Sequence, residues 1–265
     1  AMSVVMADKM IEEAEKRDVK LGVVYQLRTN PVSRKVKEAL EEDRIGSILR
    51  VCMEACVFRT QTYYDRDSWR GKWATEGGGV LINQTIHYLD LLQWFVGKPS
   101  KLQGWISTML HKIEVEDIAS SAIIFENGAH GIIQVSTIDA PPMIRFEISG
   151  YKGKIINEDN EIKLGSLEKP INEYIEKGTA WGRPKFEWVK LQPEEANYGH
   201  SVVIEDFART IMEDREPMVP GKEGRVSLEI VNAIILSSFE EKPVKFPIDR
   251  ERYSRLMERL KGVPP

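Results

Sequence analysis

The stretch IIFENGAHGIIQVSTIDAPPMIRFEIS, residues 123–149, decides the fold. Two apolar runs flank Asn127-Gly128, a dipeptide typical of the tight turn of a β-hairpin. Beyond the paired prolines that follow, every second residue from Ile144 to Ile148 is apolar, which is the period of a strand with one buried face. The pattern predicts an antiparallel meander of strands with one dry face.

The segments on either side add helices and one more long strand. Upstream, every second residue from Leu49 to Val57 is apolar, which predicts a strand, and a polar, aromatic loop leads from it into a helix that ends near Gly97. Downstream, residues 158–198 are polar with several glycines and prolines, and we expect an irregular insertion there. Two amphipathic helices are predicted at about 200–214 and 222–240.

The first 45 residues predict helix, strand, helix. The apolar run KLGVVYQL at 20–27 suits a strand covered on both faces, as in a parallel sheet, and Pro31 begins the second helix. This order is typical of a doubly wound fold, but a single parallel strand would leave its backbone groups unpaired.

Composition narrows the class of protein. The chain has 265 residues, enough for about two domains or one large one. Hydrophobic residues make up 42% and charged residues 29%, which fits neither a disordered nor a membrane protein. The net charge of -4 argues against a nucleic-acid or anionic-membrane binder. With no apolar stretch of membrane-spanning length and no signal-peptide pattern, we expect a cytoplasmic protein that acts on a small molecule.

The segment GGGVLINQTIHYLD, residues 77–90, has the strongest chemical pattern. On a helix that starts at the glycines, four residues spaced by four, three and four share one face: Asn83, His87, Asp90 and Trp94. His87 would be a general acid or base, Asn83 would bind a substrate hydroxyl, and Asp90 would orient the imidazole. The alternative is a buried His-Asp pair that only braces the helix. We find no cluster with metal-ligand spacing and predict no metal site.

The chain resembles the Gfo/Idh/MocA oxidoreductases, and the resemblance runs from about residue 3 to about 247. It rests on four stretches in order: VVYQLRTNP, WRGKWATEGGGVLINQTIHYLDLLQWFVG, GHSVVIEDFARTI and KEGRVSLEIVNAIILSSFEEKPV. It implies an α+β fold, with a mostly antiparallel, open-faced sheet backed by helices (46–265, for substrate binding and oligomerisation) preceded by an incomplete Rossmann remnant (1–45). Members with Gly-Gly-Gly and Asn-Gln before the histidine include dehydrogenases of nucleotide-linked amino sugars and their uronates.

The resemblance also implies a reaction and a set of site residues. Hydride would pass between a carbinol carbon of a sugar, nucleotide sugar or cyclitol and NAD or NADP. His87 would be catalytic and Asn83 would bind substrate, although many members have Asp at that position. The remaining implied or candidate residues are the cofactor-binding Gln26, Arg28, Trp69 and Arg70, and the substrate-binding Tyr64 and His200. Each of these residues also has a purely structural interpretation. Trp69 could be a packed loop aromatic, Arg28 a member of a surface ion pair and His200 a solvated histidine. Tyr63 and Tyr64 either stack on a sugar or cap the sheet.

The departures from the family pattern raise a second possibility. Members carry a Gly-rich phosphate loop and then a Glu-Lys-Pro motif, whereas this chain begins where that motif should have ended and has no Gly-x-Gly-x-x-Gly sequence. We therefore expect a truncated chain that is inactive alone, or a non-enzymatic sugar-binding or assembly module. We also expect a homo-oligomer, a dimer or tetramer formed through the open sheet face, because a broad apolar face is a liability in a monomer.

Overall fold

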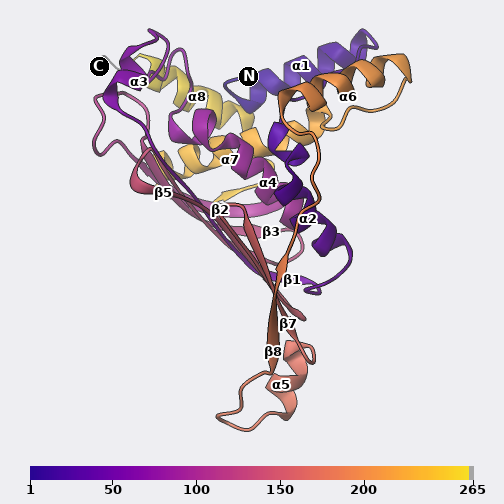
Figure 1. Cartoon of the computed structure of the whole chain (residues 1–265). Helices are drawn as coiled ribbons and strands as arrows, with labels where there is room; N and C mark the ends of the chain where they lie inside the picture. Colours follow the sequence, from indigo (N-terminus) through magenta and orange to yellow (C-terminus); the bar gives the residue numbers. More distant parts are fainter. Residues whose placement is uncertain (263–265) are drawn as a thin grey trace.

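The centre of the molecule is a nine-stranded mixed sheet with helices on one face (Figure 1). The computed structural model describes residues 1–262. The strands lie in the order β8-β7-β6-β5-β1-β4-β3-β2-β9. Their bounds are β1 Ile48–Phe58, β2 Pro99–Ser107, β3 Ile118–Phe125, β4 His130–Ser136, β5 Ile138–Gly150, β6 Gly153–Glu158, β7 Glu161–Leu167, β8 Phe186–Leu191 and β9 Val244–Lys245.

Strand β1 lies at the middle of this order, parallel to β4 and antiparallel to β5. The Asn127-Gly128 hairpin forms as predicted between β3 and β4. The predicted continuous meander is wrong, because β1 separates β4 from β5. This arrangement sets Met53 beside Ile133 on one side and Phe146 on the other, and all three are at most 2% exposed. The apolar row of β1 is thus buried between the apolar rows of β4 and β5.

The two prolines of residues 141–142 also lie differently from the prediction. Strand β5 already begins at Ile138, so the prolines are inside it. The register between β1 and β5 shifts between Cys56 and Phe58, at this same point. At such an irregularity the missing N–H groups of proline cost no ladder hydrogen bond.

Helices α4 (Ile86–Val96) and α7 (Gly221–Glu240) lie against the covered face of the sheet, and three others pack against them: α1 (Val4–Lys16), α2 (Pro31–Glu41) and α8 (Arg250–Lys261). The remaining helical segments are η1 (Gln26–Thr29), α3 (Gln61–Asp65), η2 (Val80–Gln84), α5 (Ile171–Lys177) and α6 (His200–Met212). None of the helices within residues 1–262 has the length and apolar character that crossing a membrane requires.

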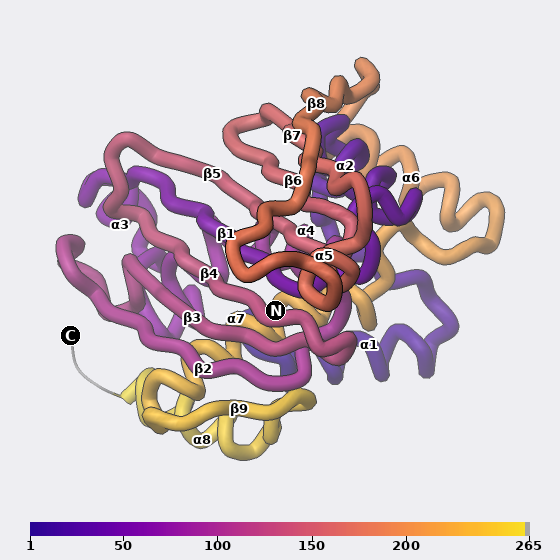
Figure 2. Tube along the Cα trace, turned by 90° about the horizontal axis from the view of Figure 1, so that it is seen from below, coloured from indigo at the N-terminus to yellow at the C-terminus, as the bar shows by residue number. Residues whose placement is uncertain are grey.

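The other face of the sheet is not the broad apolar surface that we expected. In Figure 2 strands β1 to β5 lie in front of α4 and α7, so this view shows the open side. Glu147 accepts hydrogen bonds there from Arg50 (2.5 Å) and Lys154 (2.6 Å). Large apolar side chains are scattered among the charges, with Ile132 57% and Trp105 56% exposed. The premise of an apolar open face is therefore wrong, although single apolar side chains are exposed on it.

Residues 1–45 do not contain the predicted strand. Between α1 and α2 the chain has one isolated bridge, Gly22 to Pro220, and the short helix η1. The bridge is made by Val23 N donating to Val219 O (2.9 Å) and Gly221 N donating to Leu21 O (2.9 Å). An apolar run forms a strand only where a neighbouring strand supplies partners, and here the described residues supply only 219–221. The expected Rossmann remnant is not confirmed.

Residues 158–198 are more regular than predicted. They contain β7, α5 and β8, and these two strands continue the sheet beyond β6. Figure 1 shows this hairpin and α5 extending away from the helices that cover the sheet. Five of the six residues of β8 are exposed, so this strand lacks the alternation of buried and exposed side chains that a half-buried strand has.

Candidate functional site

The glycine turn before α4 is fixed by Glu116. A Cβ atom added to Gly79 would lie 2.0 Å from the backbone oxygen of Glu116, so only glycine fits. The Glu116 Oε1 atom accepts hydrogen bonds from Gly79 N (2.8 Å) and Leu81 N (3.1 Å). Burial raises the pKa of Glu116 to about 7. The turn then continues as the π-helical η2, a kind of irregularity that is common at functional sites.

Because of this π turn, the four residues that we expected on one helix face (Asn83, His87, Asp90 and Trp94) do not share a single face. Three of them contact η1 or Tyr25, the residue before it. The rings of His87 and Tyr25 lie 5.6 Å apart at an angle of 87°. Asp90 accepts a hydrogen bond from Arg28, whose guanidinium lies 5.4 Å from the centre of the Trp94 ring. Asn83 lies on η2 and bonds elsewhere.

His87 is a half-buried histidine with an unpartnered ring nitrogen among the described residues. Its Nδ1 atom is buried and has no hydrogen-bond partner among residues 1–262. Burial lowers the pKa of His87, Asp90 opposes this effect, and His200 lowers the pKa further. The imidazole is therefore neutral at neutral pH, with a lone pair available to take a proton.

Asp90 does not orient His87, contrary to our expectation. Both of its oxygens accept hydrogen bonds from Arg28, from Nε and from Nη2, at 2.7 Å each. Arg28 also bonds Glu223 and is 4% exposed, while Asp90 is fully buried. Arg28 is thus not a surface ion pair, and its bonds to Asp90 and Glu223 use three of its five N–H donors, whereas its cofactor role stays a prediction. The pair holds η1 against α4, and removing one partner alone would leave a buried charge.

Asn83 is held by a carboxylate that the sequence pattern did not single out. The Asn83 Nδ2 atom donates to Glu76 Oε1 (2.5 Å), and the Gly71 N–H donates to Glu76 Oε2 (2.6 Å). Glu76 is 6% exposed, and burial raises its pKa. In the sequence, the only sign of this contact was the position of Glu76 directly before the glycine run.

Trp69 and Arg70 form a stacked cluster with Tyr63. The Arg70 guanidinium lies 4.3 Å from the ring centre of each aromatic side chain. Arg70 donates to the Tyr63 hydroxyl oxygen (2.5 Å) and to Asp67 (2.8 Å), and Gln84 donates to the same hydroxyl oxygen (2.9 Å). Trp69 is 42% exposed, so a bound molecule could reach this cluster. The cofactor-binding role of Trp69 and Arg70 stays a prediction.

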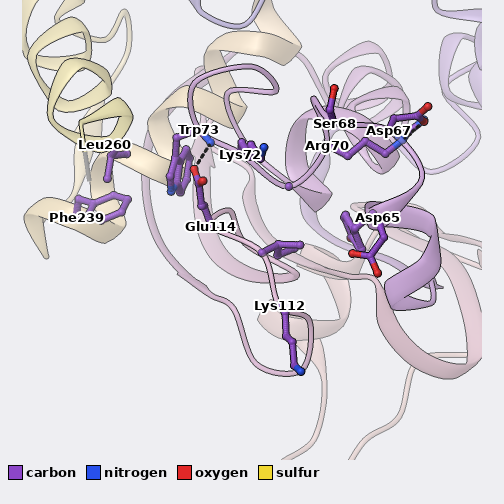
Figure 3. Close-up of a pocket in the computed structure, with 13 residues that line it drawn as sticks. Asp65, Asp67, Ser68, Arg70, Lys72, Trp73, Lys112, Glu114, Phe239 and Leu260 are labelled. Carbon is purple, nitrogen blue, oxygen red and sulfur yellow. Dashed lines mark hydrogen bonds and ion pairs between the residues drawn. The ribbon is translucent and has the colours of Figure 1, made fainter. Parts of the chain in front are cut away.

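A cavity of about 800 Å³ lies beside Arg70 (Figure 3). Polar residues of the 65–70 loop lie on one side, and Trp73, Phe239 and Leu260 lie on the other. Its charged lining side chains have both signs: Asp65, Asp67, Arg70, Lys72, Lys112 and Glu114.

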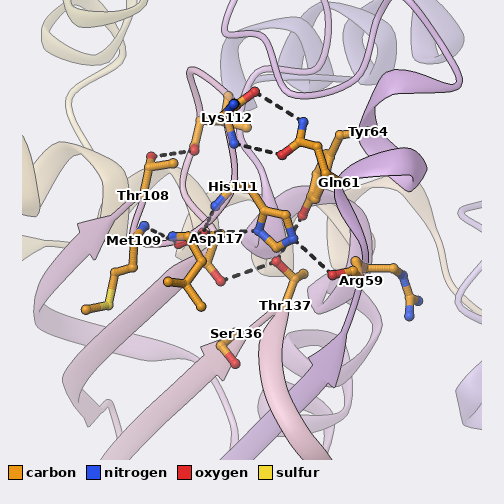
Figure 4. Close-up of polar contacts among 12 residues, drawn as sticks. Arg59, Gln61, Tyr64, Thr108, Met109, His111, Lys112, Asp117, Ser136 and Thr137 are labelled. Carbon is orange, nitrogen blue, oxygen red and sulfur yellow. Dashed lines mark hydrogen bonds and ion pairs between the residues drawn. The ribbon is translucent and has the colours of Figure 1, made fainter.

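Tyr64 is bonded within the fold and adds to the lining of the cavity beside Arg70. It is 3% exposed, its hydroxyl lies 2.9 Å from Thr137 Oγ1, and burial raises its pKa to about 12. Its ring packs 4.7 Å from the ring of His111. Figure 4 shows His111 between Asp117 Oδ2 (3.1 Å) and the Arg59 carbonyl (3.0 Å). Tyr64 therefore caps the sheet, which was the second of our two interpretations, and His111 is a buried connector between two loops.

The two remaining candidates lie near His87. His200 is the exposed first residue of α6, and the preceding Gly199 N–H donates to Thr29 Oγ1 (2.8 Å), which holds the start of α6 at η1. The Gln26 Oε1 atom is buried without a partner among the described residues. The structure thus gathers His87, Gln26 and His200 around η1, while Asn83, Trp69 and Arg70 lie along the loop and turn that lead into α4.

The chain is similar to known proteins along most of its length. Residues 33–156 match the GFO/IDH/MocA C-terminal domain. The WlbA dehydrogenase of Bordetella pertussis, solved with NADH and UDP-GlcNAcA, is 30% identical, with a TM-score of 0.78 over 94% of this chain and 70% of that one. The WlbA dehydrogenase of Chromobacterium violaceum, in complex with the same two molecules, is 29% identical, with a TM-score of 0.79 over 94% and 69%.

A curated relative extends the comparison to a free sugar. The D-xylose 1-dehydrogenase [NADP(+)] of Haloarcula marismortui is 21% identical over 244 residues, which are 90% of this chain and 64% of that protein. The chain thus spans about two thirds of the length of these relatives. Matches along so much of the chain give no support to the prediction that it is inactive alone. The resemblance inferred from the sequence is confirmed: the chain belongs to the Gfo/Idh/MocA family of oxidoreductases.

Proposed function

We propose that the protein is an NAD(P)-dependent oxidoreductase that transfers hydride at a carbinol carbon of a sugar, nucleotide-linked sugar or cyclitol. The observation that carries the proposal is His87, a neutral imidazole with an unpartnered buried Nδ1 atom among the described residues, in a chain 30% identical to a dehydrogenase solved with NADH and UDP-GlcNAcA. Perturbed titratable groups of this kind mark functional sites.

The residues present fit one end of a dinucleotide. Gln26 Oε1 and His87 Nδ1 are buried polar atoms near η1 without partners in residues 1–262, and Trp69 offers an exposed ring. Gln26, His87 and Trp69 would hold the nicotinamide end. The given sequence contains no Gly-x-Gly-x-x-Gly stretch. When bound, the nicotinamide accepts or supplies the hydride.

The chain's own residues handle the proton and the hydroxyls. For oxidation, His87 accepts the hydroxyl proton at a ring nitrogen, and for reduction it returns that proton. Its lowered pKa favours the accepting form. Asn83 binds a hydroxyl of the sugar, and α4 holds His87 rigidly, since the Arg28–Asp90 pair fixes this helix to η1.

A nucleotide-linked sugar is the substrate class that the similarities favour. The two WlbA dehydrogenases share 29–30% identity with this chain, and their structures contain UDP-GlcNAcA.

The test replaces His87 by Asn. We expect turnover of UDP-GlcNAcA with NAD⁺ or NADP⁺ to fall on the order of 10²-fold or more, with UDP-GlcNAcA affinity retained, because only the proton transfer is lost. His130→Asn is the matched control, since His130 is exposed on the open face of the sheet. Full turnover in the His87→Asn protein would refute the role of His87.

A non-enzymatic sugar-binding module is the alternative. Within the given sequence, Glu-Lys-Pro occurs at 168–170 and 241–243. The structure places these tripeptides directly before α5 and after α7, and not after a strand of a Rossmann domain. Calorimetric titration that detects UDP-GlcNAcA but neither NADH nor NADPH would support this alternative.

We also infer a homo-oligomer formed through the open face of the sheet. Ile132 and Trp105 supply exposed apolar surface there, and Arg50, Glu147 and Lys154 supply charges around it. Specific interfaces commonly combine apolar contacts with a polar rim.

A further inference from the structure

Glu76 uses both of its oxygens as hydrogen-bond acceptors. Oε2 accepts from the backbone N–H of Gly71 at 2.6 Å, and Oε1 accepts from Asn83 Nδ2 at 2.5 Å. The carboxyl group is buried between the loop and the π turn η2, with only 6% of the residue exposed. The Gly71 donor is part of the backbone, so it fixes the direction of the second oxygen.

This contact decides which end of the Asn83 amide is free. An ionised carboxylate can only accept, whereas a carboxamide has a donating NH₂ and an accepting oxygen. While Glu76 is ionised, a flipped amide would put Asn83 Oδ1 against a carboxylate oxygen at 2.5 Å, which is repulsive. One N–H of Nδ2 is therefore bound to Glu76, and this bond fixes the orientation of the amide. Within residues 1–262, this is the hydrogen bond that the Asn83 side chain makes.

We propose that Glu76 is a positioning residue that turns the Asn83 amide so that its carbonyl oxygen meets the bound sugar. The Asn83 carbonyl oxygen then accepts, as an aspartate oxygen would, and the group that it binds is a donor. Because His87 takes the proton of the reacting hydroxyl, the donor to Asn83 is a second hydroxyl that keeps its proton. The inference rests on the proposed function and narrows its substrate class to sugars with a free hydroxyl close to the reacting carbinol.

Glu76→Gln separates positioning from mere support. The introduced glutamine can still accept from Gly71 through its oxygen, and its NH₂ can donate to Asn83. The number of hydrogen bonds is kept, but Asn83 must turn its oxygen to that NH₂ group and its own NH₂ to the ligand. We expect UDP-GlcNAcA affinity, measured by calorimetry, to fall on the order of tenfold or more while the melting temperature changes little. A purely structural role predicts no change in affinity.

The double variant Glu76→Gln with Asn83→Asp supplies the rescue. The introduced glutamine then donates to one oxygen of the introduced aspartate, and the second aspartate oxygen faces the ligand as an acceptor again. We expect affinity to return to within a few-fold of the unmodified protein. Glu187→Gln, on the exposed strand β8, is the control for loss of one negative charge and should bind normally. Unchanged affinity in Glu76→Gln, or no rescue in the double variant, would overturn the inference.

A measurement without ligand separates this inference from the proposed function. The side-chain NH₂ resonances of Asn83, assigned by their absence in Asn83→Asp, report a charge-assisted bond to Glu76 and should shift upfield in Glu76→Gln. If the unmodified protein does not bind UDP-GlcNAcA but shows this shift, the proposed substrate is wrong and the positioning by Glu76 stands. If the resonances do not move, the positioning is wrong whatever the protein binds.

Discussion

Glu116 is a buried carboxyl group whose ionisation should affect the stability of the fold. Burial raises its pKa from the usual 4.5 to about 7 in the folded protein. The pKa of Glu116 is higher in the folded than in the unfolded protein. The contribution of Glu116 to the free energy of unfolding is therefore fully present below about pH 4.5 and is lost as the pH rises through 7. Each pKa unit corresponds to about 1.4 kcal/mol, so the ionised group costs at most about 3 kcal/mol at pH 8.

We therefore expect Glu116→Gln to be more stable than the unmodified protein at pH 8, with a difference that shrinks towards pH 5. The introduced glutamine keeps an oxygen that can accept from Gly79 and Leu81, but it cannot ionise. Urea unfolding between pH 5 and pH 8 measures the effect. Glu126→Gln, an exposed site beside the β3–β4 turn, is the control and should leave the pH profile unchanged. An equal gain at pH 5 and pH 8 would contradict the raised pKa.

At the level of single residues, the sequence predicted roles that depend only on residues nearby in the chain. The glycine run and the spacing of Asn83 and His87 are visible within fifteen residues. The partner of Asp90 was not visible, because Arg28 lies 62 positions away and only the folded chain brings it to Asp90. The burial of Tyr64 has the same cause, since its hydroxyl partner Thr137 lies 73 positions away.

At the scale of elements, the π turn η2 depends on one glycine. A Cβ atom at Gly79 would overlap the Glu116 carbonyl oxygen, at 2.0 Å, and both are backbone positions that cannot yield easily. We expect Gly79→Ala to lower the free energy of unfolding by about 3 kcal/mol or more, as other severe backbone clashes do. Thermal or urea unfolding measures the loss.

Gly128→Ala is the matched control for this substitution. Gly128 has a φ of +84°, but a Cβ atom there meets nothing within 4 Å. Only the left-handed backbone conformation is then penalised, at about 1–2 kcal/mol. If Gly79→Ala costs no more than Gly128→Ala, the close approach to Glu116 does not fix the turn.

The elements that the sequence predicted correctly are those with a local signal. The β3–β4 hairpin follows from Asn127-Gly128, and the long helices follow from their apolar periodicity. Residues 20–27 have the composition of a strand but only one bridge among the described residues, to Pro220, because pairing depends on neighbours and not on composition. The π turn was likewise invisible, since its cause is a contact between Gly79 and Glu116, 37 positions apart.

For the whole molecule, the α+β class was evident from the order of helices and strands, but the sheet order was not. The parallel pairing of β1 with β4 joins segments about 80 residues apart, as in Arg50↔His130. Alternation shows that a strand has one buried face and does not show which strands are its neighbours. The mixed sheet, with its charged open face, is the result that sequence patterns could not supply.

The open face leads to a prediction about assembly. Ile132 lies on β4, 57% exposed, and it alternates with Gly131 and Ile133 on the covered side, so it projects from the open face. If two copies pack there about a twofold axis, each Ile132 is buried in an isologous interface, and a lysine at that position must bury a charge.

We expect light scattering to give a mass of at least twice 30.3 kDa for the unmodified protein and a shift towards the monomer for Ile132→Lys. Ile204→Lys, on α6 with a 66% exposed side chain, is the control and should keep the larger mass. A monomer of 30.3 kDa in the unmodified protein would exclude an interface on the sheet.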